Sequence, residues 1–82
     1  MSLRKFLASD REYVRDALAR GRVEVAERAI EWAIKEAHFS AERRRHAYSR
    51  GSKQSAAIRH ATLVRHLTYL FEIRARHSQR AA

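Results

Sequence analysis

The sequence predicts an all-α fold in which a short helix is followed by a long antiparallel helical hairpin. The 82-residue chain has no proline and only two glycines, so few positions interrupt helical backbone. Its apolar residues recur three and four positions apart, which is the spacing of one helix face. Gly21 and Gly51 are candidate helix ends, because glycine accepts the left-handed conformation that often follows a helix. They divide the chain into three helical segments.

The first helix is expected over about residues 10–20. The segment Ser9-Asp10-Arg11-Glu12 reads as a capping box, in which the serine hydroxyl and the glutamate carboxylate each accept a bond from a backbone amide. The apolar residues that follow keep helical spacing; they are Tyr13, Val14, Ala17 and Leu18. We expect this helix to fold back beside the hairpin as its short third member.

The hairpin is expected to consist of helices over about residues 22–50 and 53–79, joined by a tight turn at Gly51-Ser52. Ser52 is a plausible N-cap for the later helix. The earlier helix has two apolar stripes, and a helix of that kind is covered on two sides. One stripe is Val23, Ala26, Ile30, Ala33, Ile34, Ala37, Ala41 and Tyr48, and the other is Val25, Trp32 and Phe39. No internal repeat is evident.

The whole chain, residues 1–82, is expected to form one domain. A domain this small buries only about 60% of its unfolded surface, so its core is marginal. The chain has no cysteine, which excludes disulfides. We therefore predict a three-helix bundle completed by dimerisation. The expected interface residues are Val25, Trp32, Phe39, Ile58, Tyr69 and Ile73.

Several functional classes find no support in the sequence. There is no apolar run of about 20 residues and no signal peptide, so a soluble cytoplasmic protein is expected. No nucleophile–base–acid set and no glycine-rich phosphate loop occurs, so neither an enzyme nor a cofactor is predicted. His38, Glu42 and His46 share one helix face, but the outer two lie two turns apart, which favours a surface hydrogen-bond row over a metal site.

Arg59 and His66, with six residues between them, resemble the Arg-x(4–6)-His spacing of HEPN-type ribonucleases. That resemblance implies a general base at His66 and a phosphate-stabilising group at Arg59. The pattern has only two residues in a chain rich in both types, so the non-enzymatic interpretation is preferred.

Charge is the most informative property of the sequence. The net charge is +9, and fifteen of the eighteen cations are arginine. Residues 1–41 hold eight Lys/Arg against seven Asp/Glu, whereas residues 42–82 hold ten against two, so the net charges are +1 and +8. This asymmetry indicates a polyanionic partner, and arginine can grip a phosphate with two parallel hydrogen bonds.

The densest basic segment lies at the expected tip of the hairpin. Residues 43–53 contain five Lys/Arg, a histidine and a tyrosine but no acid. We expect these side chains to grip a phosphate backbone, with Tyr48 either stacking on a base or packing inward. The predicted nucleic-acid-binding residues are Arg43, Arg44, Arg45, Tyr48, Arg50, Lys53, Arg59, Arg65, Arg76 and Arg80. In the competing interpretation the tip is a solvated helix end whose cations suit the helix dipole.

The leading functional prediction is a non-enzymatic module that binds RNA or DNA through this tip. The alternative is a small adaptor, inhibitor or regulator that docks on an acidic protein surface through Trp32, Phe39 and the basic face, since aromatic and arginine side chains are typical anchors of protein interfaces. No membrane partner is expected.

A segment of about 30 residues resembles the small-subunit ribosomal protein fifteen family. The matching features are Val23-Glu24-Val25-Ala26, His38-Phe39, His46, Arg50-Gly51 and, further on, Tyr69-Leu70. The resemblance implies a small helical bundle that binds structured RNA with its hairpin ends. The turn itself departs from the family pattern at Arg45, Tyr48 and Ser52.

Overall fold

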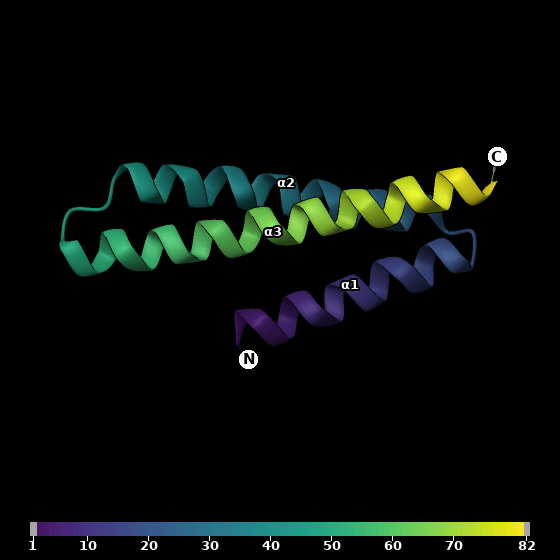
Figure 1. The fold of residues 1–82 in the computed structure, drawn as a ribbon, viewed down its shortest axis with the longest axis horizontal. Coiled ribbons are helices and arrows are strands. Elements are labelled where there is room, and N and C mark those ends of the chain that lie inside the picture. The colour runs from purple at the N-terminus through teal and green to yellow at the C-terminus, as the bar shows by residue number, and fades with distance from the viewer. Residues whose placement is uncertain (1, 82) are drawn as a thin grey trace.

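The computed structural model describes residues 2–81 as three helices, α1 (Leu3–Ala19), α2 (Val23–Arg45) and α3 (Arg50–Ala81). The helices α2 and α3 form a long antiparallel hairpin, and α1 lies beside it, running in the same direction as α3 (Figure 1). The molecule measures 48 × 24 × 16 Å. The predicted all-α class and the order of a short helix followed by a long hairpin are confirmed.

The first helix begins earlier than the sequence predicted. It starts at Leu3, where the Ser2 hydroxyl accepts a hydrogen bond from the Lys5 amide at 3.3 Å. The predicted capping box at Ser9–Glu12 is wrong, because these residues lie inside α1. The reason is tertiary packing: Leu7, one turn before the expected start, is only 2% exposed, so burial of its side chain favours helix well before Ser9.

The end of α1 follows the prediction at Gly21. This residue has a φ of +76°, in the left-handed region that glycine adopts at little cost. The Gly21 amide donates to the Leu18 carbonyl at 3.1 Å, and the Arg22 amide donates to the Ala17 carbonyl at 2.7 Å. These two bonds form a Schellman motif, which satisfies carbonyls that the helix end would otherwise leave free.

All three helices contribute to the core. Its buried members are Val14, Ala17 and Leu18 from α1, Ala26, Ile30 and Ala33 from α2, and Leu70 and Ile73 from α3. Val25, Trp32 and Tyr69 are partly buried and pack against this cluster. Four of the six predicted dimer-interface positions, including Ile73, therefore serve the chain's own core. The other two, Phe39 and Ile58, are 65% and 61% exposed.

Helix α1 covers only one end of the hairpin, so the other end projects as a two-helix arm (Figure 1). A buried polar contact joins the two helices of this arm. The Ser40 hydroxyl donates to the Ala37 carbonyl at 2.8 Å and lies 2.7 Å from Nδ1 of His60. A serine has one hydroxyl hydrogen, so the second contact requires Nδ1–H of His60 to donate to Ser40. This bond fixes α2 against α3 within the arm.

Candidate nucleic-acid interface

The hairpin turn spans residues 46–49 and so precedes the turn predicted at Gly51-Ser52. Helix α2 ends at Arg45, and α3 already begins at Arg50. The Ser52 amide donates to the Ser49 hydroxyl at 3.0 Å, and the Ser49 amide donates to the Ser52 hydroxyl at 3.2 Å. This reciprocal arrangement is a capping box. The predicted turn at Gly51-Ser52 is therefore wrong: Ser49 caps α3, and Gly51 lies in its first turn without a positive φ.

The predicted basic cluster surrounds this turn. We define the hairpin tip as Arg43, Arg44, Arg45, Tyr48, Arg50 and Lys53, all of which are exposed. Arg45 pairs with Glu42 at 3.3 Å. The other four cations make no ion pair within residues 2–81. Tyr48 is 94% exposed, so it does not pack inward, and its ring is free to stack on a base.

The helix dipole accounts for three of the five cations of the hairpin tip. Arg43, Arg44 and Arg45 lie in the last turn of α2, where cations are favourable. Arg50 and Lys53 lie at the start of α3, where the dipole is positive and cations are unfavourable. No acidic residue occurs from position 43 to position 71 to offset them. The competing interpretation of the tip as a stabilised helix end therefore leaves Arg50 and Lys53 unexplained.

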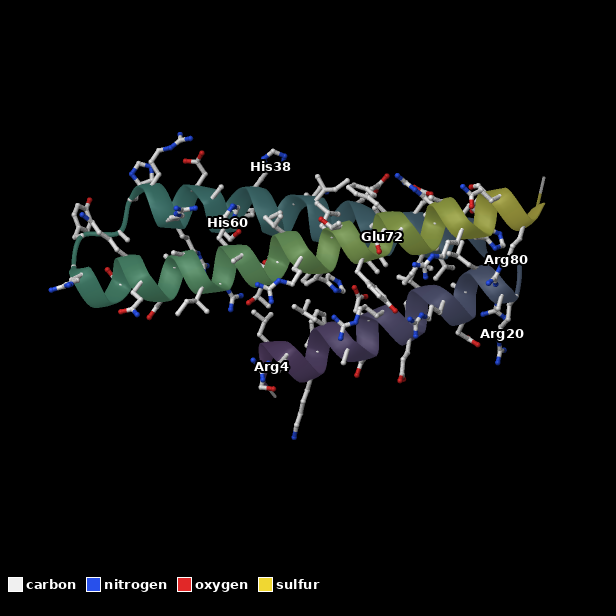
Figure 2. The ribbon with its side chains drawn as sticks, in the orientation of Figure 1. Arg4, Arg20, His38, His60, Glu72 and Arg80 are labelled. Carbon is white, nitrogen blue, oxygen red and sulfur yellow. The ribbon has the colours of Figure 1, made fainter. Side chains whose placement is uncertain are left out.

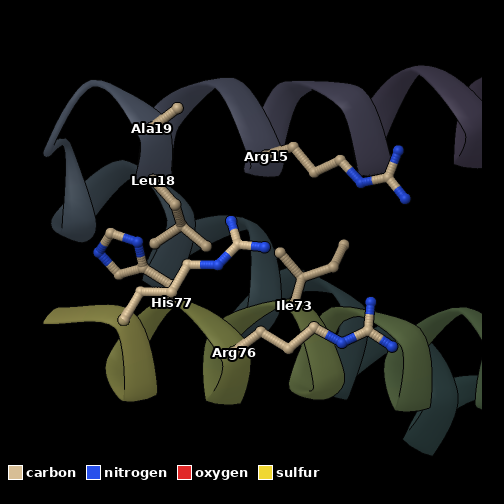
Figure 3. A pocket seen from close by; sticks show the side chains of 7 residues that line it. Arg15, Leu18, Ala19, Ile73, Arg76 and His77 are labelled. Carbon is tan, nitrogen blue, oxygen red and sulfur yellow. The ribbon is translucent and has the colours of Figure 1, made fainter. Parts of the chain in front are cut away.

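The four predicted arginines of α3 do not continue the tip as one track. Arg59 lines two grooves together with Glu36 of α2, and the second of them is also lined by Leu3 and Phe6 of α1. Arg65 lines a groove shared with α1, and Arg76 and Arg80 line a second groove of that kind. Figure 3 shows Arg15 of α1 and Arg76 of α3 extending in the same direction from the two walls of this second groove.

The sequence prediction missed the arginines that α1 brings to this surface. They are Arg4, Arg11 and Arg15. Their spacing of seven and then four residues places them on one face of a helix. That spacing was a usable signal, but it was hidden because the segment before residue 10 was not expected to be helical.

The residues considered for catalysis or metal binding are not gathered into one site. His66 is buried and its Nε2 lies 2.8 Å from Oδ2 of Asp10 in α1, whereas Arg59 lines two other grooves, neither of which includes His66. His46 lies 3.6 Å from Glu42. Within the part of the chain that the structure describes, no group of three or more His, Cys, Asp or Glu is placed to hold a metal ion.

Comparison with protein-family models, with curated protein sequences and with solved structures finds no match to this chain. The likeness to the small-subunit ribosomal protein fifteen family stays a prediction. None of the described helices combines the length and the apolar character needed to cross a bilayer.

Proposed function

We propose that this protein binds nucleic acid by gripping the phosphate backbone with its hairpin tip. The observation that carries the proposal is the set of exposed cations around one turn, at the end of an arm that projects beyond α1. Four of them, Arg43, Arg44, Arg50 and Lys53, have no ion-pair partner in the described chain. Phosphate contacts of this kind position a protein without reading the base sequence, so the expected binding is sequence-independent.

The binding is expected to depend steeply on salt. Each phosphate that a cation neutralises on duplex DNA contributes about 0.9 to the slope of log affinity against log salt concentration. Four contacts from the tip therefore predict a slope magnitude of about 3.6.

The tip is tested by the triple variant Arg43→Ala/Arg44→Ala/Arg50→Ala in a filter-binding titration against duplex. At about 50 mM salt, we expect its affinity to fall at least about tenfold and the salt slope to fall by about 2.7, because three phosphate contacts are lost. The matched control, Lys5→Ala/Arg22→Ala/Arg28→Ala, removes the same charge. Its three side chains are exposed and make no hydrogen bond or ion pair in the described residues.

The two variants separate a specific grip from a general attraction. The control is expected to keep most of the affinity, because its cations lie away from the tip. Equal losses in both variants would show that only net charge matters, and the tip would then not be the binding site.

The alternative function as a protein-docking adaptor has less support. Its main aromatic anchor, Trp32, packs edge-to-face against Phe6 of α1 with ring centroids 5.2 Å apart. This residue therefore has a partner within its own chain. Of the two aromatic anchors, only Phe39 remains largely exposed.

We also propose that two copies of the chain associate through the face of the hairpin that α1 leaves open. The accessible surface is 6343 Å², about a quarter more than the roughly 5,100 Å² expected for a compact monomer of this mass. A groove on that face is lined by Ile34, Ala37, His38, Ala41, His60 and Leu67. Figure 2 shows His38 on the side of α2 away from α1. This groove contains no Lys, Arg, Asp or Glu, so charge repulsion between two basic chains is weakest here.

Light scattering at micromolar concentration tests this association. We expect a particle of about twice the 9.6 kDa chain mass, and we expect Leu67→Glu to convert it into a single chain, because a carboxylate in an apolar interface loses its hydration. A single-chain mass for the unmodified protein would contradict the proposal.

A further inference from the structure

The seam between the parallel helices α1 and α3 holds two basic grooves. The first has a volume of about 290 Å³ and is lined by Arg4, Arg11, Arg65 and His66 among others. The second has a volume of about 310 Å³, and its lining includes Arg15, Arg76, Arg80 and His77. Each groove thus combines three arginines with one histidine. Neither has a carboxylate in its lining.

The two grooves are one pattern repeated along the seam. A shift of eleven residues relates Arg4 to Arg15, Arg65 to Arg76, and His66 to His77. The same shift relates Leu7 to Leu18, the buried α1 leucines of the two grooves. Eleven residues make three helical turns, a rise of about 16.5 Å. Because α1 and α3 run in the same direction (Figure 1), the shift moves both walls together.

Tyr69 connects the two grooves into one row of cations. The guanidinium carbons of Arg11 and Arg15 lie 5.3 and 5.2 Å from the centre of its ring. Such cation–π contacts hold an arginine in place, and they leave the N–H donors at its edge free for an anion. The row therefore runs from Arg4 to Arg80, and the carboxylate of Asp10, which reaches the seam at the first groove, is bonded to His66 and not to an arginine of the row.

Ion pairing within the fold does not account for this row. None of its six arginines makes an ion pair in the described part of the chain, whereas Arg20, Arg45 and Arg74 elsewhere do. Six unpaired like charges along one seam repel one another and lower the stability of the folded state. A repeated cationic row of this kind suits a ligand that carries evenly spaced negative charges.

We propose that this seam is a second nucleic-acid site, which holds the phosphodiester backbone of one single strand lying along α1 and α3. This inference rests on the proposed function for its class of ligand, but it uses different residues. A single strand is thinner than a duplex, whose major groove alone is about 12 Å wide, and its flexible backbone can follow a shallow seam between two packed helices. At about 3.4 Å per stacked nucleotide, the two grooves lie roughly five nucleotides apart.

The spacing of the grooves predicts a dependence on strand length. Oligothymidylates of about four nucleotides can fill one groove, whereas those of about ten nucleotides span about 34 Å and can fill both. Engagement of the second groove is then intramolecular, and it raises the affinity without any new kind of contact. We expect the longer strand to bind at least about tenfold more tightly in a fluorescence anisotropy titration at about 50 mM salt.

The test compares two variants that remove equal charge from different places. The seam variant, Arg15→Ala/Arg76→Ala/Arg80→Ala, removes the three arginines of the second groove. The tip variant, Arg43→Ala/Arg44→Ala/Arg50→Ala, leaves the arginines of both grooves in place. The seam variant is expected to bind the longer strand at least about tenfold more weakly, with a salt slope reduced by about 2, since each contact to a single strand contributes about 0.7. Its gain in affinity with strand length is expected to vanish, and the tip variant is expected to keep that gain.

Each outcome decides one proposal. If the seam variant keeps the gain with length, or if both variants lose single-strand affinity equally, the seam proposal is wrong and tip binding to duplex still stands. If the unmodified chain binds neither duplex nor single strand, both proposals fall. If circular dichroism shows that the seam variant does not fold, Arg15→Lys/Arg76→Lys/Arg80→Lys is used in its place. This variant keeps the charge but loses two-pronged phosphate bonding, so unchanged affinity for the longer strand would count against an arginine grip.

Discussion

Replacing Leu70 with alanine is expected to lower the free energy of unfolding by about 2–5 kcal/mol, the usual cost of removing a buried leucine side chain. Leu70 is 0% exposed and belongs to the cluster in which all three helices meet. The loss combines the transfer free energy of the missing methyl and methylene groups with the cavity left behind. A chain of this length has a total stability of only about 4–12 kcal/mol, so this one truncation removes a large share of it.

Urea denaturation followed by circular dichroism measures the loss. The matched control is Ile58→Ala, which truncates an apolar side chain of the same helix that is 61% exposed. We expect the control to change stability by no more than about 0.5 kcal/mol, as is usual for surface positions. If the two variants lost stability equally, the cluster around Leu70 would not be the centre of the core.

Features set by local chemistry could be predicted from the sequence. The helical class follows from apolar spacing and from the absence of proline, and the end of α1 follows from Gly21, because only glycine adopts the left-handed conformation there cheaply. The hairpin tip was also predictable, because its cations are neighbours in the sequence and stay together wherever the turn falls.

Features set by packing could not be predicted in the same way. Ser9 and Ser52 look like caps locally, yet Ser2 and Ser49 begin the helices. Each of these serines can accept an amide hydrogen bond, so the choice among them depends on which side chains the neighbouring helices bury. In the first case, burial of the Leu7 side chain extends α1 back to Ser2. The earlier turn, over residues 46–49, accounts for the second case, because α3 then runs back along α2 from Arg50 onward.

The seam site escaped prediction for a related reason. Its arginines come from two helices separated by the whole of α2, and the sequence does not give the register between them. The eleven-residue repeat involves only the positions that face the seam, so it does not appear as a repeat of the whole sequence. The same register places Asp10 opposite His66, a contact across 56 positions of the chain.

The Asp10–His66 hydrogen bond gives the second large prediction. It measures 2.8 Å and is the one side-chain hydrogen bond between α1 and the hairpin in the described residues. His66 is 2% exposed, and its Nδ1 has no partner there. Asp10→Ala would leave both ring nitrogens buried without a partner, so we expect a loss of about 1–3 kcal/mol in the free energy of unfolding. The exposed pair Asp16–Arg20 provides the control, since Asp16→Ala is expected to cost less than about 1 kcal/mol.

A further pair of measurements links this bond to the docking of α1. Trp32, the single tryptophan, packs on Phe6 of α1, so loosening α1 is expected to shift the tryptophan fluorescence in Asp10→Ala before the chain unfolds. The double variant Asp10→Ala/His66→Leu removes the stranded imidazole and is expected to recover part of the lost stability, because an apolar pair leaves no buried polar group unsatisfied. If the double variant instead lost the sum of the two single losses, the side chains would not be coupled, and the attachment of α1 would depend on apolar contacts alone.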